Sequence, residues 1–188
     1  MVDKLIEDIN KSLDINAYLA ALSLALTLPD ICGKAAYPCE KRTKRRYVDW
    51  YDDKIGQYEH PPYKDGEQWL PYLSGEVVYQ LRCSMLHQGT PNIDPEQIRD
   101  EVCKIDKFAL IIQGKNDLEI YGDSACLSKS GFGNQVSKVE RTYHVNVRRL
   151  CFVICACAKG YFHENRNKFD FFNYTIIDYD KEVNRHGH

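Results

Sequence analysis

The sequence predicts a mainly α-helical protein with a small β-element inserted before its last helix. Apolar residues recur at the three- and four-residue spacing of helices over most of the chain, whereas the interval at about 105–145 shows the two-residue alternation of strands. A chain of 188 residues is long enough for one domain with a proper core. We therefore expect a single domain over residues 1–188, a bundle of four to five helices that carries a minor, β-rich insertion.

The N-terminal segment is expected to be helical as far as Leu28-Pro29. Its apolar residues form two stripes, Ile6, Ile9 and Leu13 followed by Ile15, Leu19, Leu22 and Leu26. The register slips near Asp14, so the segment is either two helices or one helix with a break. Because proline disfavours continuation of a helix, the following PDICGK is predicted to be a turn.

The next helix is expected at about 40–55, and its first half is strongly basic. The cluster consists of Lys41, Arg42, Lys44, Arg45 and Arg46. Cations at a helix N-terminus oppose the helix dipole, so either the helix begins later or the cluster binds an anion such as RNA. Pairing of Arg45 with Asp49 one turn later would instead give a solvated, partly neutralised face.

An arginine and a histidine lie five positions apart near the end of the helix expected at about 74–87. Ser74 is a suitable N-cap, and Gly89 with the following Thr90-Pro91 ends the helix. On a helix, residues five apart point about 140° apart and differ by about 7.5 Å in height. We therefore expect Arg82 and His87 to flank a groove rather than to be stacked neighbours.

These two residue types suit work on a phosphodiester. Arginine offers a rigid fork of donors for phosphate, and histidine can take or give a proton near neutral pH. This chemistry needs no metal, and it would cut RNA and leave a cyclic phosphate. One pair is a poor catalyst by itself, whereas a homodimer would line one cleft with two pairs. In the structural alternative, Arg82 only forms a salt bridge and His87 only caps its helix.

Strand-like and helical patterns follow in the second half of the chain. A hairpin is predicted from 108–112 and 118–121, and a third strand from the alternation around Tyr143. Asn146 can cap a last helix at about 147–162, which is apolar nearly all round and is therefore expected to be central. Alternation over 172–176 suggests a final strand.

Composition limits the remaining functions. The formal charge of −2 argues against a whole-surface nucleic-acid binder, so any anion site must be local. No export signal is visible and no apolar run reaches membrane-spanning length, so the cytoplasm is the expected location, without membrane contact. The eight cysteines are expected to stay reduced. Cys151, Cys155 and Cys157 are expected to pack as small hydrophobes, and no metal or cofactor is expected.

The Arg-x4-His motif resembles that of the HEPN superfamily (higher eukaryotes and prokaryotes nucleotide-binding). LPDICGK, KRRYVDWYDDKIG and VVYQLRCSMLHQG look like a branch of uncharacterised bacterial members, and the resemblance covers about residues 1–90. It implies a four- or five-helix bundle that dimerises through its motif helices. It further implies either a metal-independent endoribonuclease in bacterial defence, with Arg82 and His87 catalytic, or a non-catalytic RNA- or nucleotide-binding or assembly module.

One position departs from the pattern of active HEPN nucleases, which most often have asparagine after the arginine. This chain has Cys83 there, and a thiol is a weak hydrogen-bond donor that cannot replace an amide. Ser84 is the neighbouring polar residue that would compensate in part.

Overall fold

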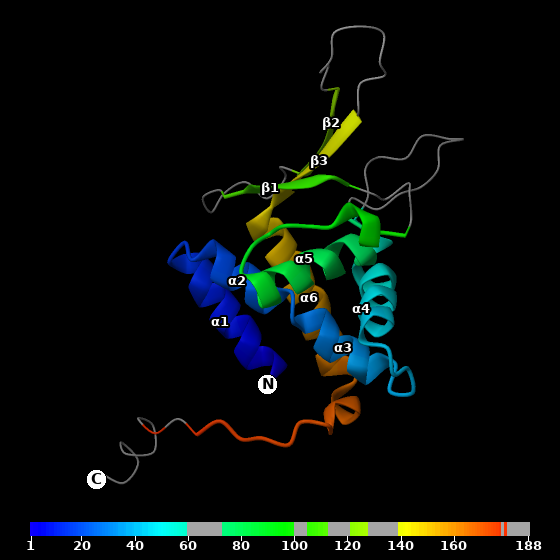
Figure 1. Ribbon diagram of the computed structural model, residues 1–188. Coiled ribbons are helices and arrows are strands. Elements are labelled where there is room, and N and C mark those ends of the chain that lie inside the picture. Colours follow the sequence, from blue (N-terminus) through cyan, green and yellow to red (C-terminus); the bar gives the residue numbers. More distant parts are fainter. Residues whose placement is uncertain (60–72, 100–104, 113–120, 128–138, 178, 180–188) are drawn as a thin grey trace, which may run out of the picture.

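A computed structural model describes residues 1–59, 73–99, 105–112, 121–127, 139–177 and 179. The chain forms a helical bundle with a small sheet at one end (Figure 1), so the predicted mainly α fold class with a minor β-element is confirmed. The helices are α1 (Val2–Asp14), α2 (Tyr18–Ala25), α3 (Leu28–Ala36), α4 (Thr43–Tyr51), α5 (Gly75–Gln88) and α6 (Val147–Glu164). A π-helical turn covers Asp52–Gly56, and short 3-10 helices cover Pro95–Gln97 and Arg166–Phe169.

The break predicted near Asp14 separates α1 from α2. Asn16 lies in it with a φ of 60°, a left-handed conformation that asparagine tolerates better than most residues. Arg148 of α6 fixes the corner, because its Nη2 donates to the carbonyl of Leu13 at 2.8 Å and to Oδ1 of Asn16 at 3.2 Å. The slip in apolar register is thus the point where the chain turns against α6.

The turn predicted for PDICGK is wrong, because this segment forms α3. Proline is tolerated in the first turn of a helix, where its missing N–H has no intrahelical acceptor to lose. Pro29 stands at that place and is buried. The correction matters for function because α3 presents Asp30 to α5.

The expectation that no apolar run reaches membrane length also needs correction. Tyr18–Ala36 is long and apolar enough to cross a bilayer by length and composition, but half of its window is buried inside the protein. The segment is divided into α2 and α3, and Leu22, Leu26 and Leu28 are fully buried in the core. These leucines of the segment therefore belong to the core.

Helices α4 and α5 pack closely, and their contact positions the motif. α4 begins at Thr43, later than expected, and presents Tyr47, Trp50 and Tyr51 to the core. A Cβ atom on Gly75 would lie 2.8 Å from the carbonyl oxygen of Val48, so a glycine is required where α5 begins.

The predicted ends of α5 are confirmed. Ser74 Oγ accepts from the backbone N–H of Val77 at 3.4 Å as the N-cap. Gly89 ends the helix with a φ of 68°, a conformation that glycine adopts without a Cβ penalty. Both ends of α5 could be predicted from the sequence because capping involves only residues close together in the chain.

The sheet contains β1 (Lys107–Ile111), β2 (Tyr121–Leu127) and β3 (Val139–Asn146) in the order β1-β3-β2. β3 is parallel to β1 and antiparallel to β2. Of the strand predicted at 118–121, only Tyr121 lies within the described residues, and it pairs with Val145 of β3 rather than with β1. β3 leads directly into α6 (Figure 1), and Asn146 Oδ1 accepts from the N–H of Arg149 at 3.2 Å, as predicted for its cap.

The C-terminal strand prediction is wrong for the described residues. Residues 172–177 form no strand and extend along the side of the bundle opposite the sheet (Figure 1). The region after Asp178 lies outside the described residues, apart from Tyr179.

The cysteines of α6 behave as expected. Cys151 is fully buried, Cys155 is nearly so and Cys157 is half-buried, all three as free thiols in or against the core. Burial raises the pKa of the Cys155 thiol to about 12, which keeps it protonated at neutral pH.

Candidate functional site

Arg82 and His87 meet within one chain at the C-terminal end of α5. Arg82 Nη1 lies 3.4 Å from His87 Nε2 and donates to it when the ring is neutral and carries its proton on Nδ1. The two side chains are closer than their 140° separation on the helix suggests, because the long arginine side chain spans the helical rise between them. His87 is exposed at this end.

An aspartate from another helix orients Arg82. Arg82 Nε donates to Oδ2 of Asp30 on α3 at 2.8 Å, and the two side chains are only 19% and 18% exposed. The sequence suggested a salt bridge as the structural alternative for Arg82 but did not identify its partner. No local pattern links residues 52 positions apart, so the pair became visible only in the folded chain.

The Asp30–Arg82 ion pair is largely shielded from solvent. Burial raises the pKa of the Asp30 carboxyl, and the opposing effect of Arg82 offsets this only in part. Burial alone would lower the pKa of Arg82, but the Asp30 carboxylate raises it, so Arg82 stays cationic. Oδ1 of Asp30 is buried without a hydrogen-bond partner among the described residues.

Two tyrosines complete the surroundings of Arg82. Tyr79, one turn earlier on α5, has its ring centroid 6.0 Å from Arg82 Cζ, which permits a cation–π contact. The same ring packs edge-on against the fully buried Tyr47 of α4, with centroids 5.2 Å apart. Arg82 therefore lies among a carboxylate, an aromatic ring and an imidazole, and sequence reasoning had identified only the last of these.

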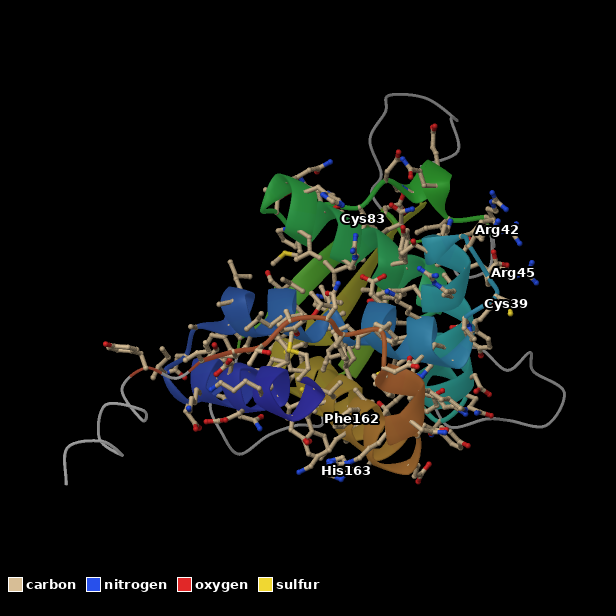
Figure 2. The ribbon with its side chains drawn as sticks, turned by 90° about the horizontal axis from the view of Figure 1, so that it is seen from below. Cys39, Arg42, Arg45, Cys83, Phe162 and His163 are labelled. Atoms are coloured by element: carbon tan, nitrogen blue, oxygen red, sulfur yellow. The ribbon has the colours of Figure 1, made fainter. Side chains whose placement is uncertain are left out.

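The two auxiliary polar residues differ in position. Cys83 is half-buried on α5 (Figure 2) and interacts with both Tyr79 and Arg82. Burial raises the pKa of Tyr79, and the neighbouring Cys83 adds to this effect. Ser84 is buried on the core side of the helix, so the structure does not bring it to the exposed end with His87.

The basic cluster extends from the linker before α4 into its first turn, and carboxylates neutralise much of it. The pairs are Arg42 with Glu40 at 3.1 Å, Lys44 with Glu76 at 2.9 Å and Arg45 with Asp49 at 3.4 Å. The last of these confirms the predicted one-turn pair. Figure 2 shows Arg42 and Arg45 on the same outer edge of the molecule.

The two remaining members of the cluster differ. Arg46 turns inward, and its Nη1 donates to the Glu40 carbonyl at 3.0 Å. Lys41 is exposed and makes no ion pair with the part of the chain that the structure describes. The five cations are therefore not equivalent, and they do not form one open anion-binding surface.

Comparisons with known proteins add no assignment to this geometry. No protein-family model matches the chain, and no curated protein or solved structure is significantly similar to it. Within the described ranges, no three His, Cys, Asp or Glu side chains gather as a metal-binding group. The candidate site therefore consists of Asp30, Tyr79, Arg82 and His87, with the basic cluster beside it.

Proposed function

We propose that this chain is a metal-independent endoribonuclease of the HEPN type, which acts in the cytoplasm as a homodimer and serves bacterial defence. The observation that carries the proposal is the contact between Arg82 and His87 at the exposed end of α5. Arg82 Nη1 and His87 Nε2 are 3.4 Å apart, so one phosphate group can reach both side chains.

Arg82 has the role of holding the phosphate. A guanidinium has five N–H donors, of which Asp30 uses the one on Nε, His87 faces one on Nη1 and Cys83 engages another. The remaining donors are available for phosphate oxygens, and the positive charge offsets the negative charge that develops in the transition state. Asp30 is a positioning residue, because it acts by fixing the plane of the guanidinium.

His87 has the role of moving protons. When Arg82 Nη1 turns from the imidazole to the phosphate, the lone pair of Nε2 is released and takes the proton of the ribose 2′-hydroxyl as that oxygen attacks the adjacent phosphorus. The bond from phosphorus to the 5′-oxygen breaks, and the departing oxygen receives a proton from a second imidazole that begins the reaction protonated. The products are a 2′,3′-cyclic phosphate and a 5′-hydroxyl.

The need for a second imidazole is the reason for the homodimer. The motif of one chain contains a single histidine, so the partner subunit's His87 supplies the second proton-transfer group. Leu86, which is adjacent to His87, is 39% exposed and offers apolar surface for contact between two α5 helices.

The second candidate is a non-catalytic RNA- or nucleotide-binding or assembly module of the same type. Two observations favour it. Asp30 neutralises Arg82, and Cys83 stands where active members have asparagine. In this case Arg82 and His87 bind a phosphate without cleaving its ester.

Incubation of the protein with single-stranded RNA in excess chelator separates the two candidates. The endoribonuclease should cleave under these conditions and leave cyclic phosphate ends, and the double variant Arg82→Ala/His87→Ala should not. RNA binding without cleavage by the wild type, lost in the double variant, would establish the second candidate. Equal cleavage by both proteins would reveal a contaminating nuclease and refute the assignment.

The homodimer is tested separately by sedimentation at micromolar concentration. The measured mass should be about twice the 21.8 kDa of the chain. A strict monomer, with or without RNA, would remove the composite site.

A further inference from the structure

A cleft lies between the beginning of α4 and the outer face of α5, close to the Arg82–His87 pair. Its volume is about 620 Å³, and Val48 forms part of its lining. Four cations line it, namely Arg42, Lys44, Arg45 and Arg99, together with the carboxylates of Asp49 and Glu76. A ligand bound in this cleft would lie beside the Arg82–His87 pair.

Tyr79 lies between the cleft and the Arg82–His87 pair. It lines the cleft, and its ring centroid is 6.0 Å from Arg82 Cζ. The edge-on contact with the buried Tyr47, at an interplanar angle of 70°, holds the ring in one orientation. A fixed and partly exposed aromatic ring beside cations is the combination with which proteins bind unpaired bases and their phosphates.

The charges of the cleft favour an anion only moderately. Glu40 pairs with both Arg42 and Arg45, so four cations face three carboxylates: Asp49, Glu76 and Glu40. Ion pairs between exposed side chains contribute roughly 0–1 kcal/mol, so a phosphate can exchange with these carboxylates at little cost.

Arg99 is the most available cation of the cleft. Its backbone N–H donates to Glu76 Oε2 at 2.8 Å, which fixes the main chain at the cleft. Its side chain is exposed and makes no ion pair with the described residues. It therefore provides a cation that need not first release a carboxylate.

We infer that this cleft binds one unpaired nucleotide of a single-stranded RNA, with its base stacked on Tyr79 and its phosphate held by Arg99 and Lys44. The inference rests on the proposed function, because the adjoining phosphate of the same strand is the one presented to Arg82 and His87. Bases inside a duplex are stacked on one another, so a double-stranded RNA cannot use Tyr79 in this way.

Fluorescence anisotropy with a labelled single-stranded RNA tests the inference. The probe is 2′-O-methylated throughout, so that it has no attacking hydroxyl and stays intact. Stacking on an aromatic side chain contributes about 1–3 kcal/mol per base, so Tyr79→Leu should weaken binding by about tenfold. Tyr79→Phe keeps the ring and should bind like the wild type.

The charge of Arg99 is tested in the same assay. Arg99→Gln should weaken binding severalfold and reduce the dependence on salt, because one phosphate contact is lost. The matched control is Arg166→Gln, since Arg166 is also an exposed arginine, with 63% of its side chain exposed, but lies outside the cleft. It should not change binding.

The outcomes separate this inference from the proposed function. If Arg82→Ala/His87→Ala weakens binding while Tyr79→Leu and Arg99→Gln do not, the RNA contacts the motif alone, and only the cleft assignment is overturned. Equal loss in Tyr79→Phe and Tyr79→Leu, or equally tight binding of a duplex, would overturn base stacking. Failure of the wild type to bind the probe would overturn both.

Discussion

Two groups of aspartate, arginine and histidine lie on different parts of this molecule and have opposite character. In the first, Asp30 binds Arg82, which in turn contacts His87. In the second, Asp3 at the start of α1 accepts from His163 Nε2 at 2.9 Å and lies 4.0 Å from Arg166. The second group has an aspartate–histidine contact, which by residue type alone looks more catalytic than an arginine–histidine contact.

Burial distinguishes the two groups. The side chains of Asp3 and His163 are 47% and 44% exposed, and Figure 2 shows His163 on the side away from Arg42 and Arg45. Asp30 and Arg82 are less than half as exposed, and they join helices from distant parts of the sequence. Exposed ion pairs are weak, whereas a shielded pair fixes a side chain in one orientation. Residue type and proximity are therefore insufficient to identify a site without burial.

The largest expected effect is on RNA cleavage. Arg82→Ala and His87→Ala should each lower the rate by at least about 10²-fold, the scale for loss of a charge-stabilising group or a positioned proton carrier. Arg166→Ala and His163→Ala are the matched controls and should retain wild-type rates. Initial rates with single-stranded RNA in chelator measure all four variants. Similar losses in both groups would abolish the functional distinction between them.

The next effect is on stability. Asp30→Ala leaves the cation of Arg82 shielded and unpaired, and breaking a buried pair in this way costs about 3 kcal/mol. Asp3→Ala should cost less than about 0.5 kcal/mol, because its pair is exposed to solvent and salt. Urea unfolding of both variants gives the two changes in free energy. If they agree within error, the shielding of Asp30 has no energetic significance.

The parts of the fold that sequence predicted correctly depend on local interactions. Ser74, Gly89 and Asn146 mark helix ends by bonds or backbone angles within a few residues of each position. The Arg45–Asp49 pair follows from helical spacing alone. Local rules therefore located the motif helix and the positions of Arg82 and His87 on it.

The features that the sequence did not predict depend either on contacts between distant residues or on a choice between two local rules that both fit the sequence. The sequence predicts that a helix ends at Pro29, although proline equally suits a first turn. The order of the sheet does not follow from the sequence, because β3, which follows β1 and β2 along the chain, lies between them. Asp30 was missed because its contact with Arg82 exists only after α3 and α5 pack. Periodicity carries no information about such pairs.

A smaller effect concerns the pH dependence of stability, and Asp52 extends the comparison between shielded and exposed carboxylates. Burial raises the pKa of Asp52 to about 6, with repulsion from Asp49 and Glu76 adding to the effect and a 2.6 Å hydrogen bond from the Gly75 N–H opposing it. The pKa of Asp3 is instead lowered by the hydrogen bond from His163. The two carboxylates should therefore affect stability with opposite signs.

For Asp52, the raised pKa means that the folded state favours the protonated form. Its stabilising contribution is full below the ordinary pKa of about 3.8 and is lost as the pH rises through about 6. Asp52→Asn keeps an acceptor for Gly75 but does not ionise. The free energy of unfolding of the variant relative to wild type should thus rise by about 2 kcal/mol from pH 4 to pH 7. Urea unfolding at several pH values measures this difference, and a constant difference would show that Asp52 is not strained by ionisation.

The smallest expected effect is on the tautomers of the two histidines. His87 Nε2 accepts from Arg82, so its ring should carry its proton on Nδ1 when neutral. His163 Nε2 faces the carboxylate of Asp3, so its ring should carry a proton on Nε2. Ring-nitrogen NMR shifts at pH 9, above the range in which histidines ordinarily titrate, distinguish these forms. Arg82→Ala should reduce the Nδ1–H population of His87 without affecting His163. A proton on Nε2 at both sites would mean that Arg82 does not orient the His87 ring, and the positioned proton carrier of the first group would be lost.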